Sequence, residues 1–201
     1  MADEKDVAHT GEAAADIYGN WLQDSAEFRK DYRRRITVVK GSEMPFENSP
    51  DGLLKHMVHE DLNTTECCLD IYMQFLEPGG QSGKSRRLAE HIFFVAEGEG
   101  YDLHWDVDFE VDETFHWGWA DEPKKYEWKR GDFVFVPAYT LKQHFNVSPD
   151  NEARLIVMTN RIFKSMGLDW IEQIENAGTY DGDLPTELAG PGWEPDSRTK
   201  S

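Results

Sequence analysis

The sequence predicts an all-β domain built as an antiparallel sandwich or barrel. From residue 36 onward, short runs rich in β-branched and aromatic residues alternate with Gly, Pro and Asn, and no helix separates them. These runs are ITVV, LLKHMVH, CCLDIYMQFL, HIFFVAEGEG, YDLHWDVDFEV, KYEWKRGDFVFVP, QHFNVS and ARLIVMTN. Parallel strands need long crossover connections, so this texture favours antiparallel pairing.

The segments that flank the strands follow from composition and spacing. Residues 1–15 are acidic and small, which is typical of a disordered tail. Apolar residues then recur at helical spacing, which predicts one helix between Ala15 and Arg35. After Arg161 the β pattern fades into a short helical piece, SMGLDWIEQIENAG, and a tail rich in Gly and Pro. The predicted organisation is a disordered tail at 1–15, a helix and arm at 16–48, a barrel at 49–162 and an extension at 163–201.

Alternation within single runs predicts which side chains share a strand face. His91, Phe93 and Val95 share one strand face, and Lys142 and His144 share another. The run from Tyr101 to Val111 reads as one strand, with Trp105 on its buried face and acidic residues on its wet face. The same alternation predicts that His104 faces solvent.

Charge and hydropathy limit the classes of partner. The formal net charge of -18 disfavours nucleic acid and anionic membranes, because both attract proteins with surplus Lys and Arg. The N-terminus lacks the basic and apolar regions of a secretory signal, and no segment is long and apolar enough to span a bilayer. We therefore expect a cytoplasmic protein that acts on a small molecule.

Two segments carry a family resemblance. Gly79, Ser85, Arg87, His91 and Gly98 fall at the spacing of the first signature motif of the cupin superfamily, which comprises small jelly-roll β-barrels. The matching positions of the second motif are Gly131, Pro137, Tyr139, Lys142 and Asn146. The resemblance covers roughly residues 50 to 160 and implies a single jelly-roll β-barrel with an N-terminal helix and a short helical C-terminal extension.

The turn residues of these motifs match, whereas the positions that hold metal in the family are altered. They are occupied by Ser85, Arg87, His91 and Lys142. Arg87 stays protonated and cannot bind a metal ion, and Lys142 could do so only after a large fall in its pKa. Two cations would instead attract a carboxylate, a phosphate or a phenolate. Arg87, with Ser85 and Tyr139 at neighbouring motif positions, is therefore a candidate substrate-binding residue.

Other residues keep a metal site open. The ending KQHFN resembles that of gentisate-type dioxygenases and their small relatives, which implies that His144 replaces the lost ligand. His91, His144 and Glu90 would then hold Fe(II) or another divalent metal, with Glu90 turned inward by a local bulge. Whether or not a metal binds, the candidate catalytic residues are His91, His144 and Lys142.

Three functions remain open from the sequence. The first is a dioxygenase-like oxidoreductase with a rebuilt metal site, acting on an anionic or aromatic metabolite. The second is a metal-free isomerase, lyase or binding protein in which Arg87 and Lys142 hold an anionic ligand. The third is an inactive barrel that serves as a structural or regulatory partner. The resemblance also implies a homodimer.

Overall fold

The computed structural model describes residues 16–64, 68–111, 115–168 and 170–183. The predicted disordered tail at 1–15 and most of the C-terminal tail therefore lie outside the described residues. The chain divides into two units, residues 1–36 and residues 37–201. In the first unit, the predicted N-terminal helix is present as α1, Ile17–Tyr32. No helix in the described part of the chain is long and apolar enough to cross a membrane.

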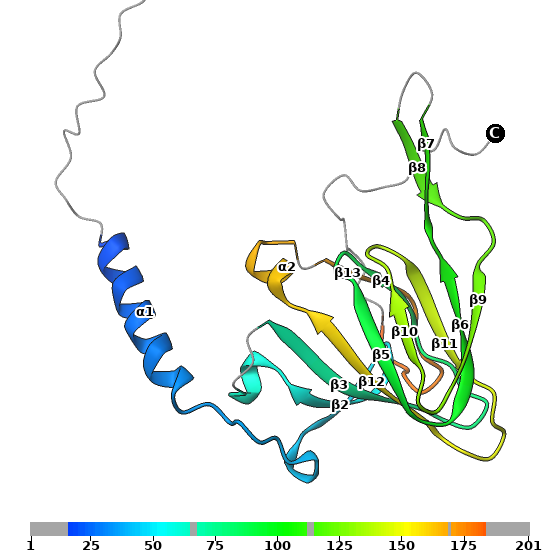
Figure 1. Cartoon of the computed structure of the whole chain (residues 1–201), viewed down its shortest axis with the longest axis horizontal. Coiled ribbons are helices and arrows are strands. Elements are labelled where there is room, and N and C mark those ends of the chain that lie inside the picture. Colours follow the sequence, from blue (N-terminus) through cyan, green and yellow to red (C-terminus); the bar gives the residue numbers. More distant parts are fainter. Residues whose placement is uncertain (1–15, 65–67, 112–114, 169, 184–201) are drawn as a thin grey trace, which may run out of the picture. The chain divides into compact units, whose positions relative to one another are not determined.

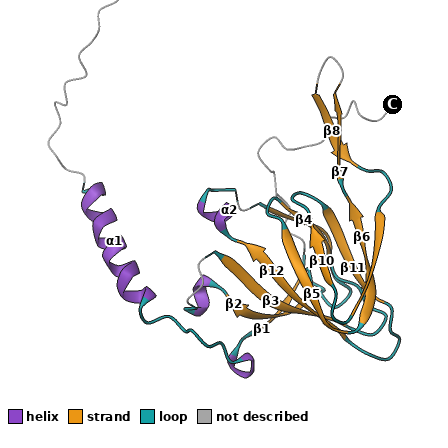
Figure 2. Ribbon diagram, viewed as in Figure 1, coloured by secondary structure: helices purple, strands orange, loops and turns teal. Residues whose placement is uncertain are grey.

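The second unit contains two antiparallel sheets that face each other (Figures 1 and 2). The six-stranded sheet has the order β1-β2-β3-β12-β5-β10, and the five-stranded sheet has the order β13-β4-β11-β6-β9. The strands of the first sheet are β1 (Phe46–Ser49), β2 (Gly52–Val58), β3 (Leu69–Leu76), β5 (His91–Glu97), β10 (Phe133–Val136) and β12 (Ala153–Asn160). Those of the second sheet are β4 (Lys84–Arg87), β6 (Glu99–Trp105), β9 (Lys124–Lys129), β11 (Leu141–Asn146) and β13 (Ile171–Glu175). The predicted all-β jelly-roll fold is confirmed.

Side chains from the two sheets meet in a shared interior. Phe93 of β5 packs edge-on against Trp128 of β9 and His144 of β11, with ring centroids 6.2 and 4.8 Å apart. Around Phe93 lies an apolar core whose members alternate along their strands: Leu54, Tyr72, Leu76, Val95, Trp128, Val136, Ala153, Leu155 and Val157. Each fully buried aliphatic or aromatic side chain contributes about 1.5–3 kcal/mol to folding.

Three elements differ from the sequence-based expectation. Residues 36–39 form no named strand, and Val38 is exposed. The run predicted as one strand from Tyr101 to Val111 is divided after Trp105: β7 (Val107–Val111) pairs instead with β8 (Phe115–Trp119) in a hairpin that extends away from the two sheets (Figure 1). The alternation of acidic and apolar residues in WDVDFEV therefore belongs mainly to this hairpin. One continuous strand was predicted because alternation in the sequence does not reveal where a strand changes its partner.

The C-terminal extension is the third difference. Among the described residues of this part of the chain, the only helix is α2, Ile162–Ser165. The predicted helical segment at 165–178 is wrong over IEQIE, which forms β13 and pairs with β4 through Ile171↔Arg87 and Gln173↔Ser85. The free edge of β4 offers this segment backbone partners, and an ion pair between Arg86 and Glu172 fixes the pairing.

Candidate functional site

Charged and polar side chains gather in the interior between the two sheets. Strand alternation turns His91 of β5 and both Lys142 and His144 of β11 inward, as predicted, and their exposed fractions are 4%, 1% and 1%. We call the interior cluster the set that these residues form with Asp51, Tyr72, Arg87, Asp102 and His104. Burial of so many ionisable groups is costly unless they are paired, so their partners define the chemistry of the site.

Lys142 is paired with Asp51, which lies in the turn between β1 and β2. The Nζ atom of Lys142 donates to both carboxylate oxygens of Asp51, at 3.0 and 3.1 Å. The side-chain amide of Gln74 donates to the Asp51 carbonyl at 2.7 Å and to its carboxylate at 3.3 Å. The predicted catalytic and anion-binding candidate Lys142 therefore already has an anionic partner in the chain.

Asp102 is the hydrogen-bond acceptor for two histidines. His144 Nδ1 lies 2.8 Å from Asp102 Oδ1, and His104 Nε2 lies 3.1 Å from Oδ2. The indole N–H of Trp128 also donates to Oδ1, at 2.8 Å. Burial raises the pKa of Asp102, but the two histidines outweigh burial and bring it to about 2. Asp102 is therefore a carboxylate at neutral pH and selects the His144 tautomer that carries its proton on Nδ1.

Both histidines at the centre of the cluster are held in their neutral form. Burial lowers the pKa of His144, although Asp102 opposes that effect. Burial lowers the pKa of His91 well below 6.5, and the nearby cations Arg87 and Lys142 lower it further. His91 Nδ1 is buried and has no hydrogen-bond partner among the residues that the structure describes. A ligand or water that fills this position would satisfy an atom that the chain leaves unpaired.

Arg87 and Tyr72 supply hydrogen-bond donors to the same interior. Arg87 Nη1 donates to the Thr159 hydroxyl at 3.1 Å, and Thr159 pairs with His91 across neighbouring strands. Burial raises the pKa of the Tyr72 phenol to about 12, although Arg87 opposes that effect. Tyr72 is therefore a neutral phenol at physiological pH and can donate a hydrogen bond.

The other predicted site residues have different surroundings. Ser85 is buried and faces Lys142 in the β4–β11 pairing. Tyr139 has a left-handed backbone with φ of 65°, and its ring stacks on Trp170 with centroids 4.9 Å apart. Its backbone N–H donates to the Arg87 carbonyl at 2.8 Å, so Tyr139 contacts the strand that carries Arg87. Glu90 is half-buried and precedes β5, whose regular pairing begins at His91.

The residues described do not fit a divalent metal ion. No group of three His, Cys, Asp or Glu side chains in the described part of the chain is arranged so that it could hold one. His91 and His144 provide two imidazoles, but Arg87 and Lys142 place positive charge beside His91. Divalent ions in such sites need several neutral or anionic donors, so this donor set is incomplete.

Sequence reasoning missed the acidic members of the cluster. His104 was expected to face solvent, but that expectation is wrong: His104 is 2% exposed and Asp102 is fully buried. The reason is that the face of β6 on which Asp102 lies meets Trp128, His144 and the rest of the interior, which local polarity does not reveal. Asp51 was missed because it lies in a turn, where an acidic residue is common and gives no indication of a buried role. The sequence did offer one indication: Asp102 and His104 are two residues apart on a predicted strand, so their side chains share a face.

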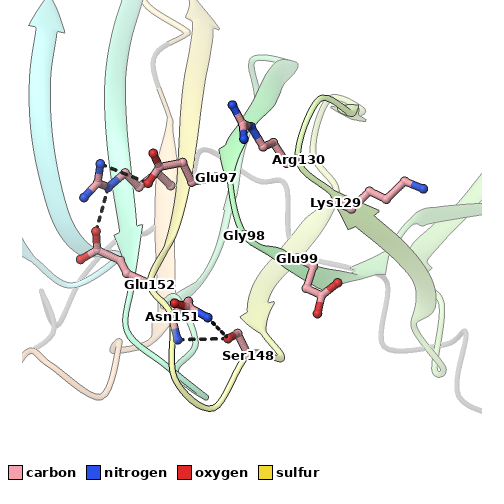
Figure 3. A pocket seen from close by; sticks show the side chains of 9 residues that line it. Glu97, Gly98, Glu99, Lys129, Arg130, Ser148, Asn151 and Glu152 are labelled. Atoms are coloured by element: carbon pink, nitrogen blue, oxygen red, sulfur yellow. Dashed lines mark hydrogen bonds and ion pairs between the residues drawn. The ribbon is translucent and has the colours of Figure 1, made fainter.

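A separate surface pocket lies at the turns that join β5 to β6 and β11 to β12 (Figure 3). Its volume is about 610 Å³, and it is lined by Glu97, Gly98, Glu99, Lys129, Arg130, Ser148, Asn151, Glu152 and Arg154. Arg154 forms ion pairs with Glu97 at 3.1 Å and with Glu152 at 2.9 Å. These ion pairs neutralise three of the charged side chains of the pocket, whereas most of the buried ionisable groups described in the second unit gather in the interior cluster.

Comparisons with known proteins give a likeness in fold alone. No family model matches the sequence, and no curated protein matches it. Similar solved structures include a polyketide cyclase from Streptomyces resistomycificus, with a TM-score of 0.45, 12% identity and coverage of 62% of this chain and 79% of that chain. An oxalate oxidase in complex with glycolate has a TM-score of 0.46 and 17% identity, over 61% and 58% of the two chains.

A cupin-like protein from Thermotoga maritima has a TM-score of 0.42 and 17% identity, over 70% of this chain and 86% of that chain. At these scores the likenesses carry no argument about activity. The fold assignment rests on the strand order and register of the two sheets.

Proposed function

We propose that this chain is a cupin-type barrel whose interior cluster binds a small anionic molecule and moves a proton on it without a metal ion. The observation that carries this proposal is the contact between Asp102 and His144. Because Nδ1 of His144 donates to a carboxylate, the neutral ring has its lone pair on Nε2. An imidazole oriented in this way by a buried carboxylate is suited to general base catalysis.

Each charged group then has a separate task. His144 Nε2 accepts a proton from the bound molecule, and Asp102 stabilises the imidazolium that forms. Arg87 holds the anionic group of the ligand, since a guanidinium binds a carboxylate through two parallel hydrogen bonds. Return of the proton to a different atom of the ligand gives an isomerase, and loss of an anionic leaving group gives a lyase.

Binding of simple acids tests the anion-binding part of this proposal. Isothermal titration with benzoate, gentisate, oxalate and phenylpyruvate should find at least one that binds the wild-type protein. Arg87→Gln should weaken that affinity at least about 10-fold, because a charge-assisted bidentate contact is lost. The matched variant Arg130→Gln, which removes an exposed arginine of the surface pocket, should leave the affinity unchanged. No binding to wild type, or equal losses in both variants, would contradict the proposal.

Proton transfer has a direct readout in heavy water. The wild-type protein should accelerate exchange of the acidic C–H protons of phenylpyruvate for deuterium, followed by NMR. His144→Gln should reduce this rate about 100-fold or more, because general base catalysis typically contributes that much. Exchange that is unaffected by His144→Gln would remove His144 from the role of base.

A dioxygenase-like metalloenzyme is the second candidate. It is favoured by the same contact, because a histidine that binds a metal usually donates its other ring N–H to a carboxylate. His91 and His144 would then be two of the protein ligands for Fe(II) or a similar ion, and Glu90, which the structure does not group with them, would have to turn inward to be the third. Elemental analysis after growth with added iron, manganese, zinc and nickel distinguishes the two candidates. Less than about a tenth of an equivalent of each metal is expected for the metal-free site, and near-stoichiometric metal would favour the dioxygenase.

A further inference from the structure

The guanidinium of Arg87 has neutral partners in the interior cluster. Among the residues that the structure describes, its side chain contacts the hydroxyl of Thr159 at 3.1 Å and the phenol of Tyr72. Lys142, the other cation of the cluster, is held by the carboxylate of Asp51. Arg87 is half-buried, and a cation in that position is stabilised by an anion that binds it. Arg87 is therefore where a ligand carboxylate fits best.

The phenol of Tyr72 offers a hydrogen-bond donor at the same place. A guanidinium has only N–H donors, so the phenol oxygen accepts from Arg87, and its own O–H is left to donate to another acceptor. Tyr72 is 8% exposed and alternates with Gln74 and Leu76 on the buried face of β3. Burial raises the pKa of the phenol to about 12, so Tyr72 keeps its proton at neutral pH.

The proposed base lies across the interior from Tyr72. Tyr72, Val157 and Phe93 are cross-strand neighbours on β3, β12 and β5, three strands that lie side by side (Figure 2). Two strand widths of about 4.8 Å separate the backbones of Tyr72 and Phe93 by roughly 10 Å. The ring of His144 packs on Phe93, with centroids 4.8 Å apart. A molecule of a few carbon atoms between the sheets would thus meet Tyr72 on one side and His144 on the other.

The contact between Arg87 and Tyr72 limits which molecules satisfy both side chains. Because the two donors are in contact, a carboxylate on Arg87 and an oxygen atom on Tyr72 belong to adjacent carbon atoms of the ligand. A carbonyl group at C2 meets this requirement and also makes the C–H bonds at C3 acidic. A hydroxyl group at C2 places an oxygen atom similarly but does not acidify C3. The base His144 therefore favours the 2-oxo acid over the 2-hydroxy acid.

We propose that the ligand is a 2-oxo acid and that Tyr72 is a catalytic residue; this inference rests on the proposed function. Arg87 binds the carboxylate, and the O–H of Tyr72 donates to the C2 carbonyl oxygen. His144 Nε2 takes a proton from C3, and the electron pair of that C–H bond forms the double bond between C2 and C3. The carbonyl π pair moves onto oxygen, which becomes an enolate oxygen stabilised by Tyr72. Return of a proton from His144 to C3 restores the 2-oxo acid.

Paired ligands that differ only at C2 test the substrate class by isothermal titration. Phenylpyruvate is compared with 3-phenylpropionate, and 2-oxobutanoate with butanoate. Wild-type protein should bind the 2-oxo acid of at least one pair at least about 10-fold more tightly, because the simple acid leaves the buried Tyr72 donor without an acceptor. Tyr72→Phe should abolish this preference and keep the affinity for the simple acid. Arg87→Gln should weaken the binding of both acids.

The control Tyr101→Phe removes the hydroxyl of a tyrosine on the opposite face of β6 from Asp102, stacked on Phe145, and should keep the preference. Equal affinities within both pairs would overturn the 2-oxo assignment. If benzoate, gentisate or oxalate still bound through Arg87, the anion-binding part of the proposed function would stand without it. If no acid bound at all, both proposals would fail.

Exchange of the C3 protons for deuterium tests the catalytic role of Tyr72. At saturating 2-oxo acid, Tyr72→Phe should lower the exchange rate constant about 100-fold, because one donor to a developing oxyanion contributes about that much. Tyr101→Phe should exchange at the wild-type rate. Exchange that is lost in His144→Gln but unchanged in Tyr72→Phe would overturn the role of Tyr72 and leave His144 as the base.

Discussion

At the scale of single residues, the buried pair of Lys142 and Asp51 connects the two sheets of the barrel. The ammonium and the carboxylate are both almost fully enclosed, so each compensates the desolvation of the other. Loss of either partner would leave an unpaired charge in the interior. Lys142, expected from the sequence to bind an anionic ligand, therefore has a structural task that can be measured separately from binding.

We expect Lys142→Met to lower the free energy of unfolding by about 3–5 kcal/mol, because the carboxyl group of Asp51 loses its partner in the interior. Urea denaturation measures this loss. The control Lys124→Met removes an ion pair with Asp106 in which the lysine side chain is 65% exposed, and it should cost less than about 1 kcal/mol. The double variant Lys142→Met/Asp51→Leu should recover most of the stability. A loss no larger than that of Lys124→Met would contradict this account.

At the scale of elements, Arg86 joins β4 to β13, to the end of β8 and to the segments that carry Tyr139 and Trp170. Its guanidinium binds Glu172 of β13 through Nε at 2.6 Å and lies 3.5 Å from the centre of the Trp119 ring. The rings of Tyr139 and Trp170 lie 5.1 Å away. Arg86 is therefore enclosed by three aromatic rings and one carboxylate, next to the strand residue Arg87 that faces the interior cluster.

Arg86→Met should destabilise the protein by about 2–3 kcal/mol, because a largely desolvated cation–π contact and a partly buried ion pair are lost together. Chemical denaturation gives the value. Lys125→Met is the matched control: Lys125 also contacts an aromatic ring, Tyr101 at 4.4 Å, and a carboxylate, Glu127, but its side chain is 51% exposed. We expect the control to change stability by less than about 1 kcal/mol. Similar losses of stability for Arg86→Met and Lys125→Met would show that burial does not make the contacts of Arg86 more stabilising than those of Lys125.

Strands with regular alternation could be predicted from the sequence, and strands held by distant pairs could not. ARLIVMTN alternates buried and half-buried residues throughout, so local pattern sufficed for β12. KSRR and IEQIE have no such alternation of apolar residues, and β4 and β13 were missed. Their pairing depends on contacts such as Arg86 with Glu172, which are 86 residues apart in the chain. Tertiary context decides such strands more than intrinsic preference does.

At the scale of the whole molecule, the interior cluster also depends on contacts between residues that are far apart in the sequence. Period-two spacing, combined with the register of the cupin motifs that the chain resembles, correctly placed His91, Lys142 and His144 in the interior. Their partners come from remote segments: Asp102 is 42 residues from His144, and Asp51 is 91 residues from Lys142. Only the packing of one sheet on the other brings these groups together, and no local signal in the sequence encodes that packing.

The buried histidines also make the stability of the whole molecule depend on pH. Burial, with Arg87, Lys142, His144 and His104 nearby, lowers the folded-state pKa of His91 well below 6.5. The unfolded chain therefore binds more protons as the pH falls, so the stability that is fully present above about pH 6.5 declines below it, by up to about 1.4 kcal/mol per pH unit for each such histidine. Urea denaturation between about pH 7.5 and about pH 5 should show a slope that His91→Gln reduces by nearly one proton. Identical slopes for wild type and His91→Gln would contradict the burial of His91 as a neutral ring.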